Sequence, residues 1–244
     1  MEWQSRTELL LGKKQLEKLQ NAHVLVAGVG GVGAYAIEML VRAGVGEITM
    51  VDADVVKSSN RNRQLIALTS TEGKSKVEIM RDRVLDINPL IKINIKHEFL
   101  KDAKIPALFE TPYDYVIDAI DSLSPKTYFI VNCLKNNIPL ISSMGAGGKL
   151  DTIKVQICDI SKSYHCKLAK MVRKRLSKFE IKKGFDVVFS PEPTFPENVI
   201  FIEDEENKKT TVGTISYMPT LFGILAASKV IRELIAKEEV ATVY

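Results

Sequence analysis

The chain has 244 residues, 45% of them apolar, and 34 Lys and Arg against 30 Asp and Glu give a formal charge of +4. This length can bury one substantial α/β core, and so small a net charge does not by itself indicate a nucleic-acid binder. Three scattered cysteines exclude a zinc site built from Cys-x-x-Cys pairs, and the apolar run PTLFGILAAS is too short for the roughly 20 residues of a membrane span. We therefore expect a cytoplasmic protein with reduced thiols and no integral membrane segment.

Helical and strand patterns alternate through the first part of the chain. A helix is predicted first, over residues 7–20. Apolar runs then predict strands over residues 23–27, 47–51, 92–96, 114–119 and 138–142. Between them, helices are predicted over residues 32–43, 72–86 and 125–136, with a short one near Ala107. Strands separated by helices indicate a Rossmann-like, doubly wound α/β fold with a mainly parallel sheet and helices on both faces.

The pattern changes after Gly145. Strands are predicted at residues 152–157, 185–190 and 198–203, and a closing helix from residue 220 to about 237. A further helix over residues 165–179 is expected to turn four apolar side chains inward: Leu168, Met171, Val172 and Leu176. We expect one domain over residues 1–244, with a nucleotide-binding core (1–150) and a C-terminal extension (151–244) that adds antiparallel strands.

A glycine-rich turn follows the first predicted strand. Gly28, Gly30 and Gly33 fit G-x-G-x-x-G, and Asp52 ends the next strand at the distance expected of an acid that binds ribose. The glycines let the backbone approach a phosphate, to which the following helix offers free N–H groups and the positive end of its dipole. A nucleotide site is predicted, but this motif does not distinguish NAD from ATP.

Further polar residues follow the ends of the neighbouring strands: Asp54, Asn60, Arg63, Gln64, Lys76 and Asp121. The carboxyl ends of parallel strands meet at one crevice, so these side chains are expected to face one ligand. Arg63 and Lys76 would neutralise charge on a departing pyrophosphate, and Asp121 would be a ligand of Mg²⁺. A hydride-transfer enzyme needs none of these residues, so ATP is favoured over NAD.

Four segments, GVGGVG, DADVVKSSNRNRQ, GKSK and DAIDS, resemble in their order and spacing the E1-like superfamily of carboxylate-adenylating enzymes, the ThiF/MoeB/HesA group. RTELLLG, DAIDSLSPK, IPLISSMGAGGKLD and the basic segment after Cys158 resemble one branch of it, the tRNA threonylcarbamoyladenosine dehydratases. The resemblance implies ATP-dependent cyclisation of N6-threonylcarbamoyladenosine in tRNA, in which the substrate carboxylate is adenylated, with release of pyrophosphate and then AMP.

The resemblance also assigns roles to single residues. It gives Asp52 to the ribose of ATP and Asp121 to Mg²⁺, and Asp54 is a further candidate for binding ATP. Arg6 would reach across a homodimer interface into the partner's ATP site, unless it is only a surface charge. Phosphate contacts are implied for Gly28, Gly30, Gly31, Gly33, Asn60, Arg63, Gln64 and Lys76. Lys76 has the alternative of being a solvated helix residue.

Nine Lys and Arg against one acid give residues 161–183 a local charge of +8, which leaves about −4 for the rest of the chain. Because the implied substrate is an RNA, we expect this segment to bind tRNA. The candidate contacts are Lys167, Lys170, Arg173, Lys174, Arg175 and Lys178. The alternative is a merely solvated helix face.

Other functions remain open at this point. The same ATP residues would serve adenylation of a ubiquitin-like sulfur carrier, although that branch commonly holds zinc in two Cys-x-x-Cys pairs. A non-catalytic nucleotide-binding scaffold and an NAD oxidoreductase are weaker alternatives, and sulfur-relay proteins are possible partners. Cys166 is the candidate for a thioester cysteine, although a structural residue at a helix start is commoner. His23, His97 and His165 do not cluster, so no histidine metal site is expected.

Overall fold

The computed structural model describes residues 2–201 and 210–236. Within these ranges seven strands form one sheet in the order β3-β2-β1-β4-β5-β7-β6. Five of them lie within residues 1–150: β1 (His23–Ala27), β2 (Glu47–Val51), β3 (Lys92–Lys96), β4 (Tyr115–Asp118) and β5 (Leu140–Ser143). The two others are β7 (Asp186–Phe189), which is parallel to β5, and β6 (Gln156–Asp159), which is antiparallel to β7. The doubly wound sheet with an antiparallel extension is therefore confirmed.

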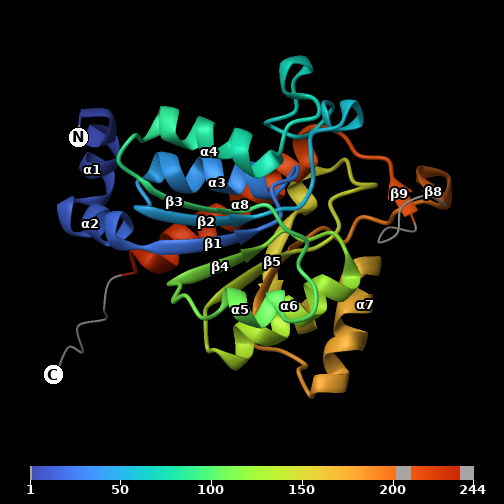
Figure 1. Cartoon of the computed structure of the whole chain (residues 1–244). Coiled ribbons are helices and arrows are strands. Elements are labelled where there is room, and N and C mark those ends of the chain that lie inside the picture. The colour runs from blue at the N-terminus through green and yellow to red at the C-terminus, as the bar shows by residue number, and fades with distance from the viewer. Residues whose placement is uncertain (1, 202–209, 237–244) are drawn as a thin grey trace, which may run out of the picture.

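Helices cover both faces of the sheet (Figure 1). One face carries α3 (Gly33–Ala43), α4 (Lys76–Ile87) and α8 (Tyr217–Leu234), and the other carries α5 (Lys104–Leu108), α6 (Leu123–Lys135) and α7 (Lys167–Leu176). Alternate residues of β1 enter different cores: Val24 and Val26 pack with α3 and α8, whereas Leu25 and Ala27 pack with α6. This two-sided burial explains why consecutive residues of β1, from Val24 to Ala27, are all apolar.

Two short helices precede the sheet, α1 (Ser5–Leu11) and α2 (Lys13–Asn21). The single helix predicted over residues 7–20 is therefore wrong in one respect, because Gly12 breaks it with φ of 82°. The predicted start of the helix at residue 72 is also wrong. Ser75, the residue before α4, pairs with Val55 in an isolated β-bridge, so the helix begins only at Lys76.

The C-terminal extension departs further from the prediction. Residues 152–154 form a 3-10 turn capped by Asp151, whose carboxylate accepts the Ile153 N–H at 3.0 Å, so β6 starts only at Gln156. A two-stranded ladder of β8 (Val199–Phe201) and β9 (Thr210–Val212) lies apart from the main sheet. The rest of the strand predicted at 198–203 and the predicted helix end at residue 237 lie outside the described residues.

In α7, Met171 is 51% exposed, so its predicted inward position is wrong. The buried residues of this helix are Ala169, Val172 and Leu176. The inward stripe is thus rotated toward a small alanine that the hydrophobic pattern had not included. None of the described helices is long and apolar enough to cross a lipid bilayer.

Candidate active site

The turn between β1 and α3 packs directly on the end of β4. Gly28 has φ of 94°, and a Cβ placed on it would lie 2.7 Å from the Ala119 carbonyl oxygen. A Cβ on Gly33 would lie 1.8 Å from the Gly28 carbonyl oxygen, so only glycine fits at either position. The turn lies where the strand order reverses between β1 and β4, the usual ligand crevice of an open α/β sheet.

Asp52 ties the end of β2 to this turn. Its carboxylate accepts the Val29 N–H at 2.6 Å and the Asp54 N–H at 2.8 Å. Burial raises the pKa of Asp52 above its ordinary value, while the nearby Lys76 opposes that shift. Two oxygens carry about four acceptor sites, so the carboxylate keeps capacity for ribose hydroxyls.

Lys76 is the first residue of α4 and is only 4% exposed. Its Nζ lies 2.7 Å from the Asp54 carboxylate, which is itself largely exposed. The alternative of a solvated helix residue is therefore wrong. A buried ammonium beside the crevice is suited to a group that carries several negative charges, because it is poorly screened by water.

The segment after β2 turns back over the glycine turn. The Asn60 side chain accepts the Lys57 N–H at 3.0 Å, and Arg63 donates to the Ser59 carbonyl at 3.0 Å. The Gln64 amide nitrogen lies 3.7 Å from a Cβ placed on Gly30, and the buried oxygen of Gln64 has no hydrogen-bond partner. A buried acceptor without a partner at this position fits a hydrogen bond to a bound polar ligand.

The loop after β4 rests on a fully buried ion pair that the sequence did not reveal. Lys126 and Asp118 are both 0% exposed, with Nζ 2.8 Å from the carboxylate. Lys126 also donates to the Ile120 carbonyl at 3.0 Å, and Asp118 accepts the Ile120 N–H at 3.0 Å and the Ser142 hydroxyl at 2.6 Å. The residue on the N-terminal side of Asp121 is thus fixed through both its N–H and its C=O.

Asp121 itself is exposed at this edge, where the Ser122 hydroxyl donates to it at 3.4 Å. Among residues 2–201 and 210–236 no three His, Cys, Asp or Glu side chains group as a self-sufficient metal site. Mg²⁺ usually binds through one or two carboxylates together with substrate phosphates. A single exposed carboxylate beside a phosphate-binding turn fits that kind of shared site.

A second loop, residues 144–151, lies at the carboxyl end of β5. Lys149 is 3% exposed and donates to the Glu192 carbonyl and, at 3.3 Å, to the Thr194 hydroxyl. Burial lowers the pKa of Lys149. The Glu192 carboxylate accepts the N–H groups of Leu150 and Asp151, so the two segments close on each other. Sequence reasoning missed this buried lysine because GAGGKLD reads as an ordinary turn.

The other predicted site residues lie away from the glycine turn. Arg6 is exposed on α1, where the neighbouring Gln4 packs on Gly44 at the far end of α3 from the glycine turn. The predicted RNA contacts stand on and just after α7, across the sheet from α3 (Figure 1). Cys166 is the N-cap residue of α7 and is 5% exposed, which fits the structural alternative better than a thioester cysteine.

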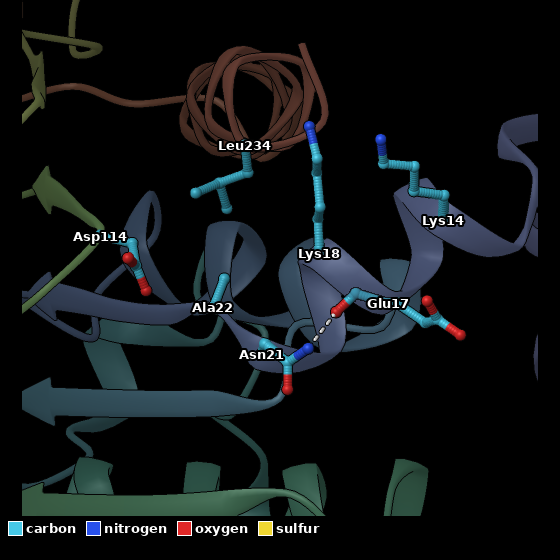
Figure 2. Close-up of a pocket in the computed structure, with 7 residues that line it drawn as sticks. All are labelled: Lys14, Glu17, Lys18, Asn21, Ala22, Asp114 and Leu234. Atoms are coloured by element: carbon cyan, nitrogen blue, oxygen red, sulfur yellow. Dashed lines mark hydrogen bonds between the residues drawn. The ribbon is translucent and has the colours of Figure 1, made fainter. Parts of the chain in front are cut away.

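A groove of about 460 Å³ lies at the opposite end of the sheet (Figure 2). Its lining includes Ala22 and Asp114, which directly precede β1 and β4, together with Lys18 of α2 and Leu234 of α8. It is therefore separate from the nucleotide crevice.

Nearly the whole chain matches one protein family. The ThiF family matches residues 4–243. The chain belongs to the ThiF family. The tRNA threonylcarbamoyladenosine dehydratase of Bacillus subtilis is 41% identical over 98% of this chain and 97% of its own. The solved structure of the Escherichia coli tRNA N6-threonylcarbamoyladenosine dehydratase in complex with ATP has a TM-score of 0.86 and 35% identity, over 95% of this chain and 93% of that one. The Escherichia coli molybdopterin-synthase adenylyltransferase is 37% identical over only 52% of this chain and 50% of its own.

Proposed function

We propose that this protein catalyses the ATP-dependent dehydration of N6-threonylcarbamoyladenosine in tRNA, with release of AMP and pyrophosphate. The observation that carries the proposal is the extent of the similarity. The dehydratase relatives match almost the whole chain, C-terminal extension included, whereas the molybdopterin-synthase adenylyltransferase matches about half. The core (1–150) and the extension (151–244) would act as one unit, which the pairing of β5 with β7 supports.

ATP would be consumed as a substrate in the crevice. The phosphates would lie along the glycine turn and the N-terminal end of α3, whose first turn has no side-chain cap. The ribose would meet Asp52, and the triphosphate would be bound by Asn60, Arg63, Gln64 and Lys76. The carboxylate of the nucleoside would attack the α-phosphorus, while Arg63 and Lys76 stabilise charge on the departing pyrophosphate.

The second step would need no covalent enzyme intermediate. The carbamoyl group of the same nucleoside attacks the activated acyl carbon, a ring closes, and AMP leaves. This fits a chain whose thioester candidate, Cys166, is buried. Mg²⁺, which Asp121 would hold with phosphate oxygens, would supply further neutralisation of the triphosphate charge.

The exposed face of α7 would supply the tRNA contacts. Lys167, Lys170 and Lys174 are exposed on this helix and Lys178 follows it, whereas Arg173 and Arg175 are half-buried. Arg173 donates to the Ser163 hydroxyl, so part of its charge holds the turn before the helix. We assign the direct phosphate contacts chiefly to the lysines. A tRNA substrate also favours a cytoplasmic location.

A homodimer is part of the proposal. Arg6 would serve the partner's ATP site, since its own lies at the other end of α3. Leu9 and Leu10, on the same helix, are 88% and 83% exposed, and such side chains favour burial at an interface.

Liquid chromatography with mass spectrometry of tRNA nucleosides tests the function. Purified protein, ATP and Mg²⁺ should convert N6-threonylcarbamoyladenosine into a product lighter by one water. Loss of conversion when ATP is replaced by its α,β-methylene analogue is the control. If the N6-threonylcarbamoyladenosine of the tRNA stays unconverted and an added sulfur-carrier protein gains an acyl-adenylate at its C-terminus, the alternative function is supported instead.

A further inference from the structure

The turn before α7 holds an aromatic ring at the surface. Tyr164 is 48% exposed, and its ring makes edge-type contacts with buried Phe189 at 5.7 Å and with His165 at 5.3 Å. An aromatic residue that only filled the core would be covered, as Phe189 is. The ring of Tyr164 instead packs against the protein in part, and the rest of it is exposed to solvent.

The backbone under this ring is fixed. The Ser163 hydroxyl is buried, donates to the Ile160 carbonyl at 2.7 Å and accepts a hydrogen bond from Arg173. His165 has φ of 53°, a left-handed conformation that is uncommon for a residue other than glycine. Such strain persists where the surroundings impose it and is often found at binding sites. The ring is therefore pre-positioned and loses little freedom when it binds a ligand.

The residues around Tyr164 are suited to binding a polyanion that carries unpaired aromatic bases. α7 carries five cations and no acid over ten residues, and its exposed Lys167 and Lys170 follow Tyr164 by three and six residues. Proteins recognise single-stranded RNA by stacking its bases on aromatic side chains beside cations that contact the phosphates.

The position of the ring connects the basic helix to the crevice. Phe189 ends β7 at the carboxyl edge of the sheet, and a Cβ on Gly145, in the loop after β5, would lie 3.9 Å from Leu168. This is the edge that also carries the glycine turn. A base on Tyr164 would therefore lie at the start of α7, at the same edge of the sheet as the crevice.

We propose that Tyr164 stacks on an unpaired nucleobase adjacent to the modified nucleoside of the RNA substrate, with His165 beside it. The inference rests on the proposed tRNA function and adds a stacking site to it. A second exposed aromatic pair, Tyr128 and Phe179 at 5.8 Å, lies near the other end of α7. Tyr128 is 50% exposed and so provides a control of matched type and exposure.

The test uses a tRNA stem-loop that carries N6-threonylcarbamoyladenosine, with the fluorescent base 2-aminopurine on either side of it. Binding is followed by anisotropy and stacking by quenching of 2-aminopurine, at constant salt. Tyr164→Ala should weaken binding by roughly 5- to 150-fold and abolish quenching, since stacking on one aromatic residue contributes that much. Tyr164→Phe should bind within about twofold of the parent, and Tyr128→Ala should keep the quenching.

ATP affinity, measured by calorimetry, should be the same in all these variants and shows that the fold and the crevice are intact. Parent-like binding and quenching by Tyr164→Ala would overturn the stacking site while RNA binding, and with it the proposed function, stands. If the parent itself does not bind the stem-loop, both the stacking site and the tRNA function are overturned.

Discussion

Lys76 and Lys167 are both lysines at the start of a helix, yet their surroundings differ completely. Lys76 is 4% exposed and bonded to Asp54, whereas Lys167 is exposed to water and ions. A buried charge at a fixed position interacts strongly with a ligand because it is weakly screened. Exposed charges are screened by salt, so their effect depends on how many charges of one sign lie together. The function of the crevice should therefore depend on single residues and change little with salt. RNA binding by the face of α7 should depend on several residues together and change strongly with salt.

The largest effect is expected where a buried charge loses its partner. Lys126→Met leaves Asp118 buried and unpaired, so the free energy of unfolding should fall by about 3–5 kcal/mol. Denaturant unfolding measures it, with Lys135→Met, an exposed lysine of the same helix, as the control. The double variant with Asp118→Asn should recover part of the stability without activity, because the loop that carries Asp121 is still unsupported. Equal stability of Lys126→Met and the control would refute the supporting role.

Lys76→Ala removes the buried cation of the crevice. Pyrophosphate release at saturating tRNA should fall about 10²- to 10³-fold, the usual cost of losing one positioned charge-stabilising group. Lys74→Ala, two residues earlier and exposed, is the matched control and should act like the parent. The defect should be equally large at low and high salt; a defect that vanishes as salt rises would mean that Lys76 acts as a surface charge.

Replacing Lys167, Lys170 and Lys174 with glutamate tests the other region. The affinity for tRNA should fall. The slope of log affinity against log salt should flatten by roughly 2–3, because binding releases fewer counterions for each phosphate contact that is lost. Arg173 is left unchanged because it also supports the Ser163 turn. Calorimetry with ATP should give the parent's affinity. An unchanged salt slope would indicate that α7 is only a solvated face.

Arg6→Ala should lower turnover about tenfold without dissociating the dimer, if Arg6 acts in the partner's site. Mixed with Lys76→Ala, it should form heterodimers in which one site has both residues intact, so part of the activity returns. Sedimentation analysis confirms mixing. Heterodimers without any recovered activity would argue that Arg6 does not cross the interface.

The smallest effect concerns His23, far from both regions. Burial lowers the pKa of His23, which contacts the Thr49 hydroxyl at 2.8 Å. The unfolded chain then binds a proton that the folded chain does not, so stability should fall as the pH drops below about 6.5. Between pH 7.5 and 5.5 the melting temperature of His23→Gln should fall less than that of the parent. The melting temperature of His97→Gln, a variant at an exposed histidine, should fall as much as that of the parent. Identical losses in all three would contradict the assignment.

Local pattern predicted most of the framework. The strands at 23–27, 47–51 and 92–96 match β1, β2 and β3 residue for residue. β1 and β2 are short, mostly buried strands bounded by turns, and β3 is an edge strand in which polar and apolar residues alternate. Errors arose where a distant residue decides the local structure. Ser75 pairs with Val55 instead of entering α4, and α7 turns small Ala169 inward instead of Met171.

The parts of the candidate site that belong to a sequence motif could be predicted. The parts that depend on burial by distant residues could not. The glycine turn and Asp52 follow from spacing. In the sequence SPKTYF, Lys126 looks like an ordinary surface lysine. Only the fold brings it to Asp118, whose carboxylate also accepts the Ser142 hydroxyl. The buried state of Lys149 likewise depends on Glu192 and Thr194, more than forty residues away.

The central claim, that the substrate carboxylate is adenylated in this crevice, is tested most directly by oxygen transfer. tRNA whose N6-threonylcarbamoyladenosine carries ¹⁸O in the carboxylate is incubated with the protein, ATP and Mg²⁺, and the nucleotides are analysed by mass spectrometry. Attack on the α-phosphorus followed by ring closure predicts one ¹⁸O in each AMP and none in pyrophosphate. Formation of ADP with the label in inorganic phosphate, or cyclised product with unlabelled AMP, would contradict it.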